Sequence, residues 1–220
     1  MAKAVRSSRR IRKSGKTKVV LALFIILVLA MTWLSGYLML HSYVIDTRVK
    51  RARKIATRVL AQTSLSDQDR DRYAMAIARN CVGKGLSPAV VTAIVVVESG
   101  GNSLAVAPSG DLGLMQVNVR IHSKVFNFEE KNLLNPEQNI AVGTSILRGM
   151  IARHGTEKAI AAYNGLLPEK RDYTSRVQAV LGKAGFDPQS EQVEWKLSWG
   201  EVISDWIGAL TSRWSRGEEG

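Results

Sequence analysis

The sequence predicts a mainly α-helical domain with a loop-lined cleft, preceded by one N-terminal transmembrane helix. An uncharged apolar run occupies residues 19–40, capped segments with helical periodicity follow it, and an irregular glycine-containing stretch interrupts them over 100–134. No segment alternates apolar and polar residues clearly enough to predict a sheet. We divide the chain into a basic tail (1–18), a transmembrane helix (19–41), a helical stalk (42–66), a globular domain (67–184) and a tryptophan-rich amphipathic tail (185–220).

The N-terminal quarter carries the whole excess of positive charge. Lys and Arg number 13 in residues 1–54 against the single Asp46, whereas residues 55–220 hold 18 basic and 18 acidic residues. A nucleic-acid-binding domain would carry its basic patch on the folded body. The charge distribution therefore argues against nucleic acid as a partner.

The apolar run is long enough to cross a membrane, because residues 19–40 at helical rise reach about 33 Å. Trp33 and Tyr37 lie where aromatic rings favour the interface. The positive-inside rule places residues 1–18 in the cytoplasm and the globular domain in the periplasm. The competing interpretation is a cleaved secretory signal, which the segment's length and the lack of a small-x-small site after Ala30 disfavour. Both interpretations export the domain.

Residue usage excludes several kinds of site. The single cysteine, Cys81, is incompatible with a disulfide scaffold, and its helical surroundings predict a small buried apolar residue. The three scattered histidines have no zinc-ligand spacing, and no glycine-rich phosphate loop is present. We therefore expect neither a metal nor a cofactor.

Helix start signals define the elements of the domain. Ser, Thr and Asn favour N-cap positions, and proline favours the first helical turn. After a stalk helix over 48–63, the expected helices begin at Ser66, at Ser87-Pro88, at Asn135-Pro136, at a capping Thr156 and near residue 171. The helix that starts at Asn135 is expected to end at Gly155, because glycine is favoured just after a helix.

Glu98 stands out because it directly follows the apolar run "AIVVV" and precedes two glycines. A carboxylate is costly to ionise among apolar neighbours. We therefore expect this carboxyl to retain its proton near neutral pH, so that it can act as a proton donor.

Four sets of motif residues occur in the order and spacing of one known domain. They are "ESGGN" (98–102), "SGDLGLMQVN" (109–118), "LLNPEQNIAVGTSIL" (133–147) and "AIAAYNG" with "YTSRV" (159–165 and 173–177). Over about residues 70–183 the chain thus resembles the lytic transglycosylase domain of the soluble-transglycosylase, goose-type-lysozyme-like family. The resemblance implies a lysozyme-like fold. The motif forms are most similar to the specialised transglycosylases of secretion, conjugation or phage machines.

The resemblance implies a peptidoglycan lytic transglycosylase that cleaves the β-1,4 bond between N-acetylmuramic acid and N-acetylglucosamine. Glu98 occupies the position of the family's single acid and base. It would protonate the glycosidic oxygen and then take a proton from the C6 hydroxyl of muramic acid, which closes a 1,6-anhydro ring. Asp111 is expected to form a turn. A hydrolytic, lysozyme-like muramidase would instead need Asp111 or another acid to position water.

Other motif residues are expected to bind the substrate. Gly113 permits close backbone approach, Met115 offers an apolar surface to a sugar face, and Gln116 offers a donor and an acceptor. The tyrosines are expected to stack on sugars while an asparagine amide holds the N-acetyl group, the alternative being that the tyrosines are core residues. The expected substrate-binding set is Ser109, Gly113, Met115, Gln116, Asn118, Tyr163, Asn164 and Tyr173. Many relatives have a serine where this chain has Ala107.

The expected partners are peptidoglycan strands, the membrane, and a secretion, conjugation or virion machine, with a virion membrane as an alternative location. The tail over 185–220 holds four of the five tryptophans and could pack on the domain, lie in a membrane interface or dock on a partner. A different class of function is an inactive wall-binding or assembly module. Glu98 together with Gln116 and Tyr163 favours activity, because a binding module needs no proton donor.

Overall fold

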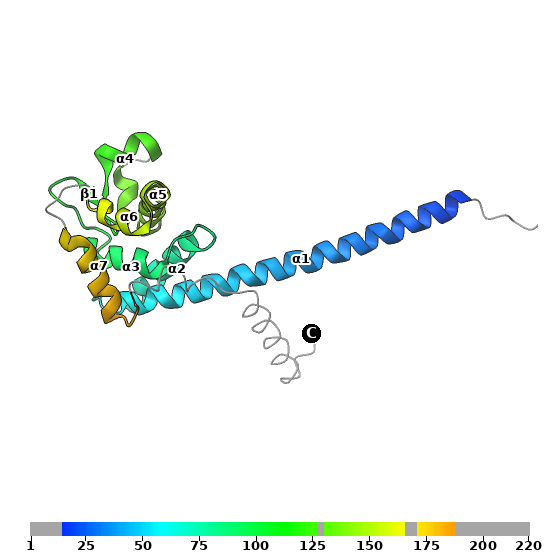
Figure 1. Cartoon of the computed structure of the whole chain (residues 1–220), viewed down its shortest axis with the longest axis horizontal. Coiled ribbons are helices and arrows are strands. Elements are labelled where there is room, and N and C mark those ends of the chain that lie inside the picture. Colours follow the sequence, from blue (N-terminus) through cyan, green and yellow to red (C-terminus); the bar gives the residue numbers. More distant parts are fainter. Residues whose placement is uncertain (1–14, 127–129, 166–170, 188–220) are drawn as a thin grey trace, which may run out of the picture. The chain divides into compact units, whose positions relative to one another are not determined.

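The computed structural model describes residues 15–126, 130–165 and 171–187, and the structural statements below concern these residues. They form two units, Met1–Tyr43 and Val44–Gly220. The elements are shown in Figure 1. In chain order they are α1 (Gly15–Leu60), α2 (Asp67–Cys81), α3 (Pro88–Ser99), β1 (Asp111–Leu112), β2 (Val117–Asn118), α4 (Val119–Phe126), the 3-10 helix η1 (Glu130–Leu134), α5 (Pro136–His154), α6 (Thr156–Tyr163) and α7 (Arg171–Lys183).

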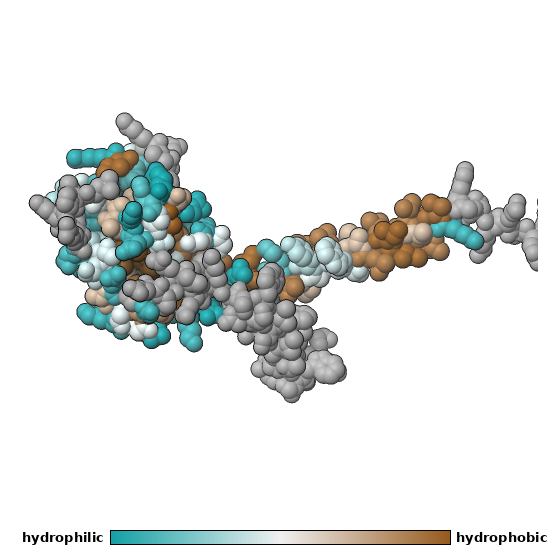
Figure 2. All heavy atoms as spheres, viewed as in Figure 1, coloured by the Kyte–Doolittle hydropathy of each residue, from teal (hydrophilic) through white to brown (hydrophobic). Residues whose placement is uncertain are grey.

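The first unit contains the apolar part of helix α1. Its large side chains are exposed to the surroundings, and Figure 2 shows apolar residues covering this stretch of the helix. The most apolar window has a mean hydropathy of 2.6 and buries none of its residues inside the protein. Such a helix is long and apolar enough to cross a membrane, as the sequence predicts.

The end of α1 belongs to the second unit. Ala56, Val59 and Leu60 are fully buried in its apolar core. The segment expected to form a stalk over 42–66 therefore contributes its last helical turns to the core of the domain.

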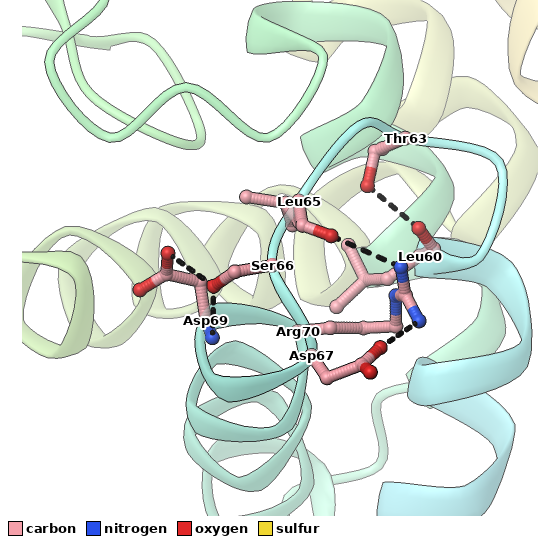
Figure 3. Close-up of polar contacts among 7 residues, drawn as sticks. All are labelled: Leu60, Thr63, Leu65, Ser66, Asp67, Asp69 and Arg70. Carbon is pink, nitrogen blue, oxygen red and sulfur yellow. Dashed lines mark hydrogen bonds and ion pairs between the residues drawn. The ribbon is translucent and has the colours of Figure 1, made fainter.

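Local hydrogen bonds define the turn from α1 to α2 (Figure 3). Ser66 caps α2 as predicted, because its hydroxyl accepts a hydrogen bond from the Asp69 amide at 3.1 Å. The Arg70 guanidinium donates to the Leu65 carbonyl at 3.0 Å and to the Asp67 carboxylate at 2.8 Å. The bond to Ser66 satisfies a backbone amide that the start of a helix leaves without a partner.

Helix α3 lies at the centre of the core. Every residue from Pro88 to Val95 is buried, including Thr92, whose hydroxyl donates to the Pro88 carbonyl at 2.6 Å. A helix that is apolar on all sides must be covered on all sides. Helices α2 and α7 contact it, and the same apolar core includes side chains from the end of α1, from α5 and α6, and from the hairpin.

The predicted helix starts at Ser87-Pro88 and Asn135-Pro136 are confirmed. Thr156 was expected to be a cap, but it is the first residue of α6, and Gly155 holds the N-cap position without a side-chain bond. Gly155 has a φ of 76° and its amide donates to the Ile151 carbonyl. One glycine thus ends α5 and starts α6.

The described residues of the stretch over 100–134 are more ordered than the sequence predicts. β1 and β2 pair antiparallel, with Leu112 opposite Val117, and α4 and η1 follow them. Two-residue strands are too short to show alternation in a sequence. The start of α4 had a local signal, because the Asn118 side chain accepts a hydrogen bond from the Ile121 amide at 3.1 Å.

Candidate active site

A cavity of about 630 Å³ opens in the second unit between the end of α3, the hairpin, α4, α5 and the end of α6. Cavities of this size are typical of small-molecule sites. Six of the nine residues expected at the site line it, namely Glu98, Ser109, Gln116, Asn118, Tyr163 and Asn164. The other three, Gly113, Met115 and Tyr173, lie behind its wall.

The buried helix α3 delivers Glu98 to the cavity. The helix is enclosed as far as Val95, and its last turn emerges from the core to half-buried positions. Gly100 then ends the helix in the left-handed conformation, with a φ of 63° and its amide bonded to the Val96 carbonyl at 3.0 Å. The glycine after "ES" is therefore a helix terminator that leaves the carboxyl at a helix end.

Tyr173 lies behind Glu98 and holds it. Its ring is 1% exposed, and its hydroxyl donates a 2.7 Å hydrogen bond to Glu98 Oε1. Burial, the charge of Glu98 and this hydrogen bond raise the pKa of Tyr173, which therefore remains a donor. The expectation that this tyrosine stacks on a sugar is wrong, because the ring is enclosed by the core.

The loop that carries the "GLMQ" motif turns inward. Met115 is fully buried, so it cannot offer its side chain to a sugar face as expected. It packs against α5 so closely that a Cβ on Gly143 would lie 2.6 Å from the Met115 sulfur. Gly113 has a φ of 73°, and a Cβ there would lie 2.4 Å from the Leu133 carbonyl oxygen. The close approach that Gly113 permits is thus made to the protein itself.

Asn139 fixes the shape of this loop, and no sequence pattern assigned it a role. It is fully buried in α5, and its side-chain oxygen accepts a hydrogen bond from the Met115 amide at 2.7 Å. Its side-chain nitrogen donates to the carbonyls of Leu112 at 2.7 Å and Leu133 at 2.9 Å. The available signal was a polar residue on the apolar face of the helix that starts at Asn135.

Gln116 and Tyr163 form adjoining parts of the wall. Gln116 has a φ of 47°, and its amide nitrogen donates to the Gly113 carbonyl at 2.9 Å and to the Ala105 carbonyl at 3.2 Å. The Tyr163 hydroxyl donates to the Met115 carbonyl at 3.0 Å. Burial, followed by the charges of Glu98 and Asp111, raises the pKa of Tyr163. The phenol therefore stays protonated beside the acidic part of the cavity.

Asp111 supplies a second carboxylate to the cavity wall. The Ser109 hydroxyl donates a hydrogen bond to Asp111 Oδ2 at 2.5 Å, and both residues line the cavity. Burial lowers the pKa of His122, and the nearby charge of Asp111 opposes this shift. Asp111 therefore bonds to a side-chain hydroxyl. The sequence had predicted a turn in which its carboxylate bonds to backbone amides.

The sequence model of the Transglycosylase SLT domain family matches residues 75–184, half of the chain. The chain belongs to this family. The resemblance inferred from the motifs and the lysozyme-like fold that it implies are confirmed.

The SLT domain is also similar to curated proteins. The chain is 39% identical over 106 residues to the Endo-type membrane-bound lytic murein transglycosylase A of Cronobacter sakazakii, and this match covers 44% of this chain and 49% of the relative. The protein of the same name from Enterobacter sp. has the same identity and coverage. That from Citrobacter koseri is 39% identical over 80 residues, covering 33% and 38%. The chain thus spans about half the length, or less, of these relatives.

Further residues of the SLT domain, which the motifs did not indicate, also line the cavity. Arg153 and His154, from the last turn of α5, line it together with His122 and the apolar Ile146 and Met150. Basic residues in a last helical turn are common because they complement the helix dipole. Their position in the sequence therefore gave no sign of a role at the site.

Within the described part of the SLT domain, no three His, Cys, Asp or Glu side chains come together as metal ligands. The titratable groups around the cavity are carboxyl, imidazole, guanidinium and phenol groups. This set can transfer protons and bind polar and anionic groups.

Proposed function

We propose that the protein is a membrane-anchored peptidoglycan lytic transglycosylase. It would cleave the β-1,4 bond between N-acetylmuramic acid and N-acetylglucosamine and form 1,6-anhydro-muramic acid ends. One observation carries this proposal: the Glu98 carboxyl stands at the end of a buried helix, is held by Tyr173, and opens into a cavity large enough for sugars. The names of the curated relatives, which describe lytic murein transglycosylases, support it.

In the first step, the Glu98 carboxylic acid donates its proton to the glycosidic oxygen. The bond between this oxygen and C1 of muramic acid breaks, and positive charge develops at C1. The substrate's own N-acetyl group can stabilise this charge, as in substrate-assisted glycosidases. The hydrogen bond from Tyr173 fixes the carboxyl during the transfer.

In the second step, the Glu98 carboxylate takes the proton of the C6 hydroxyl. The O6 atom forms a bond to C1, which closes the anhydro ring and returns Glu98 to its acid form. The proton lost in the first step is thus recovered, and no water is consumed. One carboxyl is sufficient for both steps.

The polar groups of the wall would hold the sugars. Gln116, Asn118 and Asn164 line the cavity with amide groups, which can bind hydroxyl and N-acetyl groups. Tyr163 offers the edge of its half-buried ring, since its hydroxyl is bonded to the Met115 carbonyl. These interactions would position the C1 atom against Glu98.

The membrane helix would place the SLT domain on the periplasmic side, with the basic residues 1–18 in the cytoplasm. The apolar window of α1 and the charge asymmetry of the chain support this orientation. The motif forms support a role in local wall opening for a secretion, conjugation or virion machine.

The test is digestion of purified peptidoglycan sacculi by the full chain in detergent. We expect the wild type to release fragments with anhydro ends, which weigh one water less than hydrolytic products, and Glu98→Gln to release none. Glu157→Gln is the matched control, because Glu157 is exposed on α6 away from the cavity. Equal release by the wild type and Glu98→Gln would reject the proposal.

Two other results would redirect the assignment. Reducing ends in place of anhydro ends would identify a hydrolytic muramidase, for which Asp111 is the available second carboxylate. Sacculus binding without any release by the wild type would identify an inactive wall-binding module.

A further inference from the structure

Arg153 is a cationic side chain of the cavity wall. Among the residues that the structure describes, it has no anionic partner. It is exposed in the last turn of α5, and it forms no hydrogen bond or ion pair with any residue that the structure describes. Arg53 pairs with Asp71 and Arg72 with Glu137, whereas Arg148, which is likewise without a bonded partner among the described residues, does not line the cavity. A guanidinium in the wall of a binding cavity that has no partner among the described residues can bind a ligand.

The cavity's own carboxylates do not pair with Arg153. Glu98 accepts its hydrogen bond from Tyr173, and Asp111 accepts its bond from Ser109. Arg153 thus adds positive charge to a cavity in which Glu98 serves the chemistry. The ligand group that complements it is an anion, for which a guanidinium offers paired donors.

The chemistry of the proposed substrate limits which anion this can be. The sugars of the glycan strand are uncharged, whereas the peptide attached to the lactyl group of muramic acid carries carboxylates. Ile146 and Met150 precede Arg153 on the same face of α5 and also line the cavity. This face therefore presents an apolar surface followed by a cation, which matches a short peptide with aliphatic side chains and a carboxylate.

We infer that Arg153 determines specificity by binding a carboxylate of the peptide on muramic acid, so that the site prefers glycan whose peptides keep their charge. The inference rests on the proposed function. His154, the adjoining residue at the same end of the cavity, can add a second donor.

The test compares two soluble substrates that differ only in charge: peptide-bearing glycan fragments, and the same fragments with their peptide carboxylates converted to amides. The full chain in detergent is assayed as wild type, Arg153→Gln, Arg153→Lys and Arg148→Gln. Arg148 is the matched control, because it is exposed on the same helix and does not line the cavity.

We expect Arg153→Gln to lower the preference for the charged substrate, measured as the ratio of kcat/KM values, by about threefold to tenfold. The change should lie mainly in KM, Arg153→Lys should keep part of the preference, and Arg148→Gln should keep all of it. A ratio that is the same in the wild type and Arg153→Gln overturns the inference.

A binding measurement separates this inference from the proposed function. In the Glu98→Gln background, calorimetric affinity for the charged fragments should fall on adding Arg153→Gln, and affinity for the amidated fragments should fall less. An active wild type with no difference between the substrates would reject the role of Arg153 alone. An inactive wild type would reject the proposed function, and the inference with it.

Discussion

The Tyr173 hydroxyl donates a 2.7 Å hydrogen bond to Glu98 Oε1 and so joins two residues that are 75 positions apart in the sequence. The bond connects the first turn of α7 to the last turn of α3, the two helices that pack together beneath the cavity. The position of the proposed proton donor therefore depends on the docking of two helices.

Replacing Tyr173 by phenylalanine should reduce activity with little effect on folding. Tyr173→Phe keeps the buried ring and removes the donor to the Glu98 carboxylate that develops as the proton is transferred, and hydrogen bonds to charged groups contribute about 1.5–3 kcal/mol. If the carboxyl must be held for catalysis, kcat should fall about 10-fold to 100-fold. Sacculus digestion measures the rate and circular dichroism the melting temperature. Unchanged kcat would show that the bond serves packing only.

Asn139 should be important for stability as well as for the shape of the site. Asn139→Ala leaves the Met115 amide and the carbonyls of Leu112 and Leu133 without their bonds in a buried position. We expect a loss of about 2–4 kcal/mol in the free energy of unfolding. Gln138→Ala, at the exposed neighbouring position, should change it by less than about 0.5 kcal/mol. Urea unfolding distinguishes the two, and equal effects would contradict the role of Asn139.

Two glycines of α5 should respond to alanine with opposite signs. A Cβ at Gly143 would lie 2.6 Å from the Met115 sulfur, whereas a Cβ at Gly149 would meet only an arginine nitrogen at 3.9 Å. Gly143→Ala should lower the free energy of unfolding by about 1–3 kcal/mol by displacing Met115. Gly149→Ala should raise it by about 0.5–1 kcal/mol through helix propensity. Thermal unfolding of both variants checks the signs, and stabilisation by Gly143→Ala would contradict the close packing.

Cys81 should make the domain less stable as the solution becomes alkaline. Burial raises the pKa of the Cys81 thiol, so above the unfolded value of about 8.5 only the unfolded chain releases this proton. Folding stability should then fall by about 1.4 kcal/mol per pH unit from this group. Below that pH the thiol is protonated in both states and contributes no slope.

The measurement is urea unfolding between pH 8 and 10 for the wild type and Cys81→Ala. The variant loses some stability at all pH values because the buried sulfur is removed. Its pH slope should be shallower than that of the wild type over this range. Parallel slopes would mean that the thiol titrates alike in the folded and unfolded chains.

The sequence predicted those parts of the structure that depend on neighbouring residues. Ser66, Ser87 and Asn135 cap their helices by bonds to residues three positions away, and such signals are visible in the chain. The helix that is long and apolar enough to cross a membrane was similarly evident from its uninterrupted apolar run. Family motifs placed Glu98, Gln116 and Tyr163 at one cavity, although no local pattern would have brought them together.

The parts that were missed depend on packing between distant segments. Whether Met115 faces the cavity or the core is decided by Gly143 and Asn139 on α5, and a loop has no periodicity that reveals it. A tyrosine at position 173 can bind either a sugar or a carboxyl group, and the sequence alone does not show which. Arg153 reaches the cavity only because α5 runs along it.

Because α3 is enclosed in the core, the residue proposed for the chemical step and most residues that contact the ligand lie on different elements. The proposed proton donor, Glu98, belongs to the buried helix α3, while most of the cavity wall comes from the hairpin, α4, α5 and α6. If the proposed function holds, substitutions on those outer elements should alter which glycans fit while the geometry of the proposed proton transfer stays intact. One inner scaffold could in this way serve walls of different composition, with new preferences acquired at the rim and the reaction itself inherited unchanged.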